Sequence, residues 1–174
     1  LTVVEVIFLL FGRMNLFDAI IHSFSTAGTG GFSNRNASIA YYDSAYIDAV
    51  ITIFMVLFGV NFNLYYFAIM GNIKELFKNE ELRVYIGIIA SSVVLISINI
   101  LGQYGTITKA VRYASFQVGA IITTTGFCTA NYELWPEFSK CILLLIMVIG
   151  ACAGSTGGGI KISRLVIMLK SIKR

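Results

Sequence analysis

One kind of segment occurs twice between long apolar stretches, and it limits the possible folds more than any other feature. The first copy is "NLFDAIIHSFSTAGTGGFS" (Asn15–Ser33), and the second is "TKAVRYASFQVGAIITTTGFC" (Thr108–Cys128). Each contains roughly 10–15 residues of half-polar helical sequence followed by a Thr/Gly cluster, too short and too polar to cross a bilayer alone. Both segments are therefore expected to be re-entrant helices that enter the membrane and return as extended chain.

The two copies are in register. Phe32 and Phe127 lie 95 residues apart (127 − 32). The same offset pairs Gly31 with Gly126, Thr29 with Thr124, and Ala19 with Ala114. A fixed offset of this kind indicates an internal repeat. The predicted unit is a helix, a re-entrant helix with a Thr/Gly exit, and a second helix.

Composition places the chain in a membrane. Hydrophobic residues make up 57% of the sequence and charged residues 13%, whereas soluble domains have about 25% charged residues. Three apolar stretches reach the ~20 residues that a spanning helix needs: Tyr46–Met70, Val84–Leu101, and a stretch from about Phe138 to Leu169 with a Gly-rich interruption. The shorter opening run, "LTVVEVIFLLFG", is expected to be the end of a truncated helix.

The basic residues predict the orientation. Most of the 13 Lys and Arg residues lie in the hinge at 74–83 and in the C-terminal tail. The positive-inside rule therefore places hinge and tail in the cytoplasm and both Thr/Gly clusters toward the outside of a multi-pass cell-membrane protein. The basic tail could also contact anionic membrane lipid. The charges do not lie beside the readout residues that nucleic-acid binding would need.

The Thr/Gly clusters "TAGTGGFS" and "TTTGFCT" have the chemistry of a cation filter. Backbone carbonyls and Thr hydroxyls can replace the hydration shell of an alkali ion, and Gly allows the backbone to turn carbonyls inward. Each preceding helix would direct its partly negative C-terminus at the ion. The alternative is that small residues only permit tight helix packing. Two clusters in register favour the filter.

The Gly-rich interruption "GACAGSTGGGIKIS" invites comparison with a nucleotide-binding loop. That motif requires Lys directly after its last Gly, but Ile160 separates Gly159 from Lys161. Inside a spanning helix, consecutive glycines predict a break, which a membrane tolerates where the backbone lines a cavity or is covered by protein. A flexible loop beneath a filter would be a gate. A kink needed only for packing is the alternative.

The motifs "STAGTGGFS", "GVNFNLYYF", "ITTTGF" and "GSTGGGIKISR", in this order, resemble the Trk/Ktr/HKT superfamily of potassium and sodium translocating subunits. The resemblance implies an all-α integral membrane fold, potassium-channel-like, with repeated helix–re-entrant pore helix–helix units around a central pore. It implies the second unit at residues 1–75 with a truncated first helix, a cytoplasmic hinge at 76–82, and the third unit at 83–174 with a broken last helix.

The same resemblance assigns residues and partners. It implies potassium uptake, with K⁺ as the transported ion, a cytoplasmic nucleotide-binding regulatory ring and a homodimer. The filter falls on Thr29, Gly30, Gly31, Phe32, Thr124, Thr125, Gly126 and Phe127. The gating loop falls on Gly150, Ala151, Cys152, Ala153, Gly154, Ser155, Thr156, Gly157, Gly158 and Gly159, with Lys161 as an anchor below it.

Three alternatives remain. A sodium or cation:proton secondary transporter could use a midplane site at a broken helix, but no inverted repeat and no buried acid suited to proton coupling is apparent. A P-loop enzyme is disfavoured by Ile160, so the chain is expected not to be an enzyme. A purely structural subunit would not need a filter. Zinc binding has little support from three cysteines without a CxxC pair and one histidine.

Overall fold

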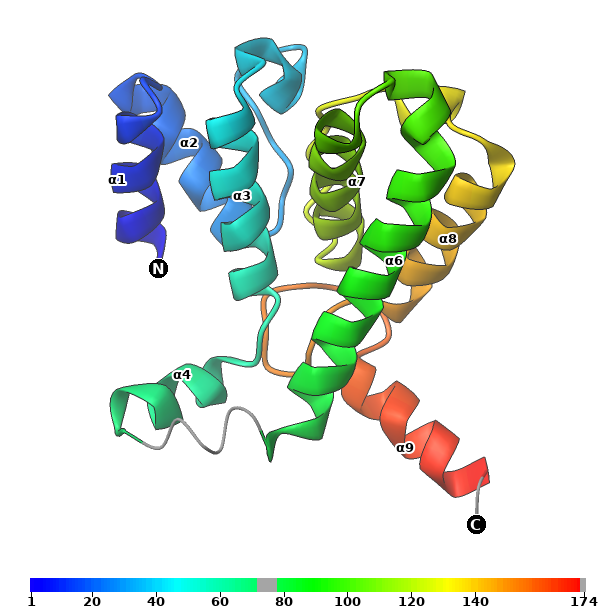
Figure 1. The fold of residues 1–174 in the computed structure, drawn as a ribbon. Helices are drawn as coiled ribbons and strands as arrows, with labels where there is room; N and C mark the ends of the chain where they lie inside the picture. Colours follow the sequence, from blue (N-terminus) through cyan, green and yellow to red (C-terminus); the bar gives the residue numbers. More distant parts are fainter. Residues whose placement is uncertain (72–77, 173–174) are drawn as a thin grey trace.

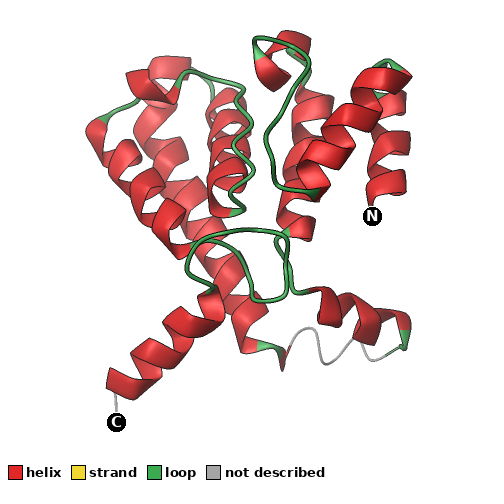
Figure 2. Cartoon of the chain, turned by 180° about the vertical axis from the view of Figure 1, so that it is seen from behind, coloured by secondary structure: helices red, strands yellow, loops and turns green. Residues whose placement is uncertain are grey.

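The computed structural model describes residues 1–71 and 78–172. Throughout these ranges the regular structure is helical (Figures 1 and 2). The elements are α1 (Thr2–Phe11), α2 (Leu16–Ala27), η1 (Ser38–Tyr42), α3 (Ala45–Phe58), α4 (Phe62–Ile69), α6 (Glu80–Tyr104), α7 (Ile107–Ile122), η2 (Tyr132–Leu134), α8 (Glu137–Ile149) and α9 (Ile162–Ile172).

The helices form two similar groups that stand side by side (Figure 1). In the first, α2 packs against α1 and α3; in the second, α7 packs against α6 and α8. Contacts between α3 and α7 join the groups. Arg112 of α7 reinforces this junction with ion pairs to Asp48 (2.7 Å) and Asp43 (3.2 Å). The helices α2 and α7 therefore each lie between two flanking helices, as the repeat predicts.

Local sequence explains where several helices begin. The side chains of Asn15, Ser44 and Asn79 accept hydrogen bonds from backbone N–H groups in the first turns of α2, α3 and α6. Such caps satisfy donors that a helix leaves unpaired at its N-terminus. The re-entrant helix α7 begins after Thr106 without a side-chain cap, and both re-entrant helices start near the upper end of Figure 1.

The expected spans are confirmed in one case and corrected in another. The run Val84–Leu101 lies within α6, an unbroken helix long and apolar enough to cross a membrane. The last stretch is interrupted as predicted, with α8 and α9 on either side of residues 150–161. The single continuous helix expected over Tyr46–Met70 is wrong, because the chain bends by 94° between α3 and α4.

The predicted unit boundaries at 75 and 83 stay a prediction. Residues 72–77, which include Lys74 and the start of the predicted hinge, lie outside the described residues, as do residues 173–174 of the tail. The neighbouring elements α4, α9 and the start of α6 lie together at one end of the molecule, opposite η1 and η2 (Figure 1). The molecule therefore has two distinct ends, with the re-entrant helices starting at one of them.

Candidate functional site

The two Thr/Gly clusters lie directly against one another where α2 and α7 end. A Cβ atom placed on Gly31 would be 2.1 Å from the carbonyl oxygen of Thr125. Equivalent backbone hydrogen bonds end the two helices: Gly30 N–H donates to the carbonyl of Ser25, and Thr125 N–H donates to the carbonyl of Ala120, both at 2.9 Å. These pairs are related by the 95-residue offset, so the repeat is conserved in geometry as well as in sequence.

The backbone of both clusters alternates in handedness. Thr29 (φ 48°), Gly31 (φ 66°), Thr124 (φ 58°) and Gly126 (φ 84°) have positive φ, whereas the residues between them do not. Positive φ is strained for a β-branched residue such as Thr. Alternation of this sign turns successive peptide groups so that their oxygens can line one side of the chain, the arrangement a filter of carbonyls requires.

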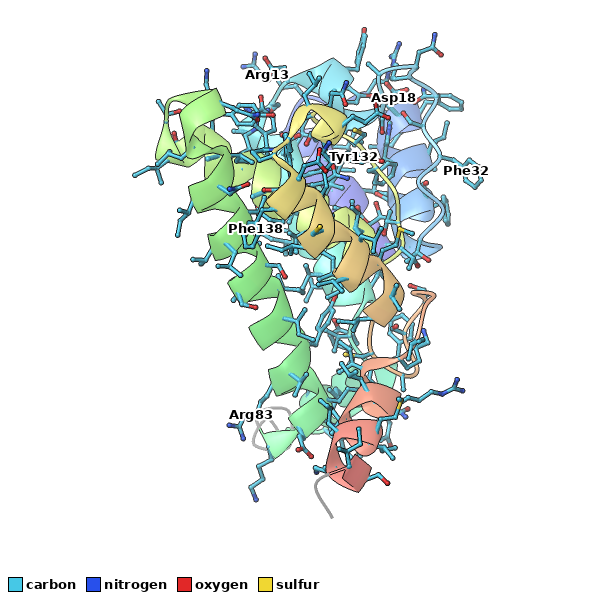
Figure 3. All side chains as sticks on the ribbon, turned by 90° about the vertical axis from the view of Figure 1, so that its right-hand side faces the viewer. Arg13, Asp18, Phe32, Arg83, Tyr132 and Phe138 are labelled. Carbon is cyan, nitrogen blue, oxygen red and sulfur yellow. The ribbon has the colours of Figure 1, made fainter. Side chains whose placement is uncertain are left out.

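The two cluster phenylalanines differ in their surroundings. Phe127 is fully buried, and its ring lies 5.8 Å from that of His22 on α2. Phe32 is 78% exposed and points away from both groups of helices (Figure 3). The second cluster is therefore supported by the first unit, whereas Phe32 has no such support within the described residues.

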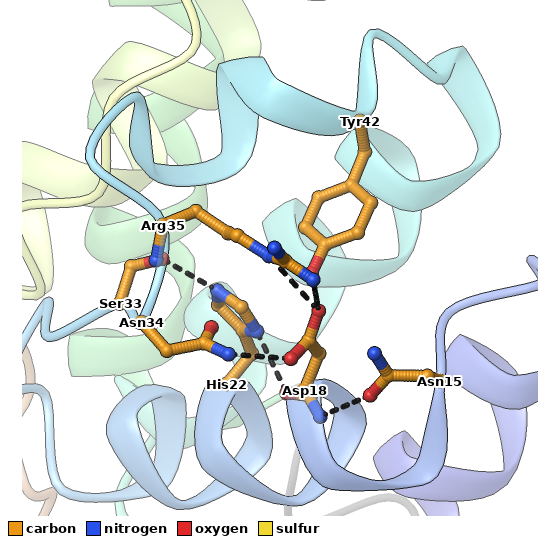
Figure 4. A network of polar contacts seen from close by, with 7 residues as sticks. All are labelled: Asn15, Asp18, His22, Ser33, Asn34, Arg35 and Tyr42. Atoms are coloured by element: carbon orange, nitrogen blue, oxygen red, sulfur yellow. Dashed lines mark hydrogen bonds and ion pairs between the residues drawn. The ribbon is translucent and has the colours of Figure 1, made fainter.

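A polar network centred on Asp18 holds the chain that follows the first cluster (Figure 4). The Asp18 carboxylate accepts hydrogen bonds from Asn34 (2.5 Å), Arg35 (2.8 Å) and Tyr42 (2.5 Å). Burial acts to raise the pKa of Asp18, but these donors and the Arg35 charge outweigh it and hold the pKa below its usual range. Burial and the Asp18 charge raise the pKa of Tyr42 to about 12.

His22 completes this support from the interior of α2. Its Nδ1 lies 2.7 Å from the Asp18 carbonyl oxygen, which makes Nδ1 a donor, and its Nε2 lies 2.9 Å from the Ser33 hydroxyl. The side chain is fully buried. Together with Asp18 it holds Ser33, Asn34 and Arg35, so the chain that leaves the first cluster is fixed by the protein.

The Gly-rich loop, residues 150–161, lies beneath both clusters and contacts each of them. The Thr29 hydroxyl donates to the carbonyl of Thr156 (3.1 Å), and Gly158 N–H donates to the Thr124 hydroxyl (2.7 Å). The two strained threonines are thus the residues that meet the loop. Lys161 also contacts the loop, since its ammonium donates to the carbonyl of Gly157.

The loop is hydrogen-bonded to the bend between α3 and α4 as well. Cys152 N–H donates to the Gly59 carbonyl and Phe62 N–H donates to the Gly154 carbonyl, both at 3.1 Å. Sequence reasoning missed this contact because it treated residues 46–70 as one helix. A signal was present, since the 95-residue offset places Gly59 on Gly154.

Glu5 differs from the other buried acids of the described residues, because Asp18 and Asp48 each form an ion pair with an arginine. Glu5 of α1 is fully buried, and neither of its carboxyl oxygens has a hydrogen-bond partner among the described residues. The Thr26 hydroxyl of α2 donates to the carbonyl of His22 (2.7 Å) and not to Glu5. The sequence analysis found no buried acid suited to proton coupling, and Glu5, buried without a hydrogen-bond partner among the described residues, reopens that alternative.

The family model described as "TrkH: Cation transport protein" matches residues 9–174. The chain belongs to the TrkH cation transport family. Over 177 aligned positions it is 38% identical to the Trk system potassium uptake protein TrkH of Escherichia coli K12, with all of this chain and 37% of that protein aligned. It is 35% identical over 163 residues to the Trk system potassium uptake protein TrkG of the same organism, covering 92% of this chain and 33% of that protein.

A solved structure agrees. The crystal structure of the potassium transporter TrkH from Vibrio parahaemolyticus superposes with a TM-score of 0.93 at 35% identity, over 100% of this chain and 39% of that one. The expected superfamily and the all-helical membrane transporter fold are confirmed, and the family is one of cation transport proteins, not enzymes. The chain spans little more than a third of the length of these relatives.

Proposed function

We propose that this chain contributes two quadrants of a potassium uptake pathway. In each, the ion passes a filter segment, Thr29–Phe32 or Thr124–Phe127, and the loop at 150–161 gates flux beneath them. One observation supports this most strongly: the two filter segments repeat the same alternation of φ at an offset of 95 residues and lie in contact. Tight packing alone would not require strained threonines at equivalent positions.

The loop's position supports its role as a gate. Its backbone atoms contact Thr29 and Thr124 directly beneath the filter segments. Exposed glycines, Gly154, Gly158 and Gly159 among them, leave much of the loop without side-chain packing. A segment with few buried side chains can leave its position at low cost.

Sidedness and assembly follow from the same proposal. The filter segments face the outside, and the start of α6 and the tail face the cytoplasm, where basic residues are retained. The exposed ring of Phe32 is expected to pack against another unit of the complete protein, in the way that the ring of Phe127 packs against His22 of the first unit. By family resemblance, the membrane subunit pairs with a second copy and binds a cytoplasmic nucleotide-binding ring.

Potassium rescue tests the filter and the gate together. The complete protein that carries this chain is expressed in a bacterium lacking potassium uptake, and growth is measured at limiting potassium. Gly126→Ser is expected to abolish rescue or admit sodium, because φ 84° disfavours Ser although no atom lies within 4 Å of its Cβ. Gly105→Ser is the matched control, with φ 68° and equally open space outside the filter.

Deleting residues 153–158 is expected to give unregulated flux. Growth that is identical for the native protein, Gly126→Ser and the deletion would show that the clusters only pack helices.

Glu5 favours a second candidate, cation:proton coupling. An isolated charge is costly to bury, and intramembrane acids commonly belong to proton relays. In this case Glu5→Gln would abolish the dependence of potassium flux on an imposed proton gradient, measured in vesicles. An unchanged dependence would leave simple conduction as the mechanism.

A further inference from the structure

Glu81 is the side chain that connects the gating loop to the start of α6. It lies in the first turn of that helix, at the end of the molecule opposite the origin of the re-entrant helices. One of its carboxylate oxygens, Oε1, accepts two backbone hydrogen bonds, from Ala153 N–H at 2.6 Å and from Ser163 N–H at 3.1 Å. These donors stand on the two sides of the loop's Gly-rich centre.

The two contacts have a clear electrostatic basis. Ser163 is in the first turn of α9, where backbone N–H groups are unpaired and the helix dipole favours a negative charge. Ala153 contributes a loop N–H, which needs a partner inside a membrane protein. A charged acceptor forms stronger hydrogen bonds than a neutral one. The Glu81 carboxylate thus binds both the first part of the loop, at Ala153, and the start of α9, at Ser163.

We propose that Glu81 is the positioning residue that keeps the gating loop closed against the filter. A movement of α6 relative to α9 would pull Oε1 from one donor or the other, and the loop would lose its hold near Ala153. Displacement at the cytoplasmic end of α6 would in this way be transmitted to Thr156 and Gly158, which contact the filter threonines. This inference rests on the proposed function, since it names the latch of that same gate.

Its neighbour provides a matched comparison. Glu80 lies one residue earlier, is exposed, and forms an ion pair with Lys170 of α9. It therefore also joins α6 to α9, but it does not contact the loop in the structure. Exposed pairs contribute little stability, so a change at Glu80 tests whether any weakening of the α6–α9 contact is sufficient.

The loop contains its own reporter. Cys152 is fully buried, and its N–H bonds the bend at Gly59. Its modification by a maleimide therefore measures loop opening without reference to ion flux. Cys128 and Cys141, which are more accessible, are first replaced by Ala, together with any cysteine elsewhere in the complete protein.

In this background Glu81→Ala is expected to raise the rate of Cys152 modification about tenfold, because the variant loses the free energy of a hydrogen bond to a charged group and the open loop becomes more populated. Glu81→Gln, which keeps an acceptor but loses the charge, is expected to have a smaller effect. Glu80→Ala should match the native rate. Only protein that is correctly inserted in membranes is scored, and Glu81→Gln provides the test if Glu81→Ala fails to fold.

Rubidium uptake is measured on the same variants and on the 153–158 deletion. If Glu81→Ala speeds rubidium uptake in the native background but causes no further increase when it is combined with the deletion, Glu81 acts through the loop as a latch. A native modification rate in both Glu81 variants would overturn the inference. Faster modification with unchanged uptake in all variants would retain the latch and refute the gate, so the two proposals can fail separately.

Discussion

The two repeats each interrupt the helix that follows their Thr/Gly cluster, the proposed filter segment, but they do so in different ways. The first interruption takes only Gly59, Val60 and Asn61 before α4 begins with bulky aromatic residues. The second extends over residues 150–161. Equivalent positions in a repeat have thus produced a fixed bend in one unit and a long loop in the other.

Hydrogen bonding explains the contrast. At the first bend, two carbonyls of α3 accept hydrogen bonds from tyrosine side chains: Tyr85 donates to Val56 (3.2 Å) and Tyr65 donates to Leu57 (2.6 Å). The carbonyls of Phe58 and Gly59 accept from Thr156 and Cys152 of the second interruption. In the second, several of the loop's contacts are made with the filter threonines and with Glu81. The first bend keeps the hydrogen bonds of Tyr85 and Tyr65 even when the loop leaves and can be the more rigid of the two, whereas the loop is attached to its neighbours by single hydrogen bonds and can move.

The largest effect is expected at Gly150, where the second interruption begins. Its backbone has φ 71° and ψ −163°, a region essentially restricted to Gly, and an added Cβ would lie 2.4 Å from the Gly158 carbonyl. Gly150→Ala should therefore destabilise the loop by about 2–4 kcal/mol. Thermal unfolding in detergent and Cys152 modification measure this. Gly87→Ala, with open space in α6, is the control and should not lower stability.

A smaller effect is expected at Gly59, which has an ordinary φ of −75°. Here an added Cβ would lie 2.2 Å from the Tyr85 hydroxyl, so Gly59→Ala should cost about 1–3 kcal/mol through overpacking. Tyr85→Phe removes that oxygen. In a double-mutant cycle the pair should be more stable than the sum of the single changes predicts. Strictly additive effects would show that the added Cβ does not clash with the Tyr85 hydroxyl and that the backbone of the bend shifts instead.

The smallest effect is expected at Asn61. Its side chain caps α4 by accepting from Asn63 N–H (3.0 Å), and Asn61→Ala should cost about 1 kcal/mol in unfolding free energy. It should leave Cys152 modification unchanged, because it acts on the rigid bend. Increased modification would show that the two interruptions open together and that the contrast drawn between them is wrong.

Much of this architecture is readable from the sequence, and the exceptions have physical causes. The 95-residue repeat, the re-entrant helices and the break near Gly157 all depend on local composition. The bend at Gly59 was missed because residues 46–70 are apolar enough to be taken as one span and the bend is stabilised by Tyr85 and Cys152 from distant elements; the match of Gly59 to Gly154 in the repeat was the signal for it. Glu81 was likewise invisible as a loop ligand, since an acid in the first turn of a helix has an ordinary explanation at its own N-terminus.

The hydrogen bond from Gly158 N–H to the Thr124 hydroxyl has a thermodynamic consequence. This bond occupies a lone pair of the Thr124 hydroxyl oxygen, and an ion in the lowest part of the proposed filter would need the same oxygen as a ligand. A docked loop and a bound ion at this level are then competing ligands for one atom. By reciprocal linkage, any ion that gains affinity when the loop departs must itself promote that departure. The permeating cation would act as an effector of its own gate.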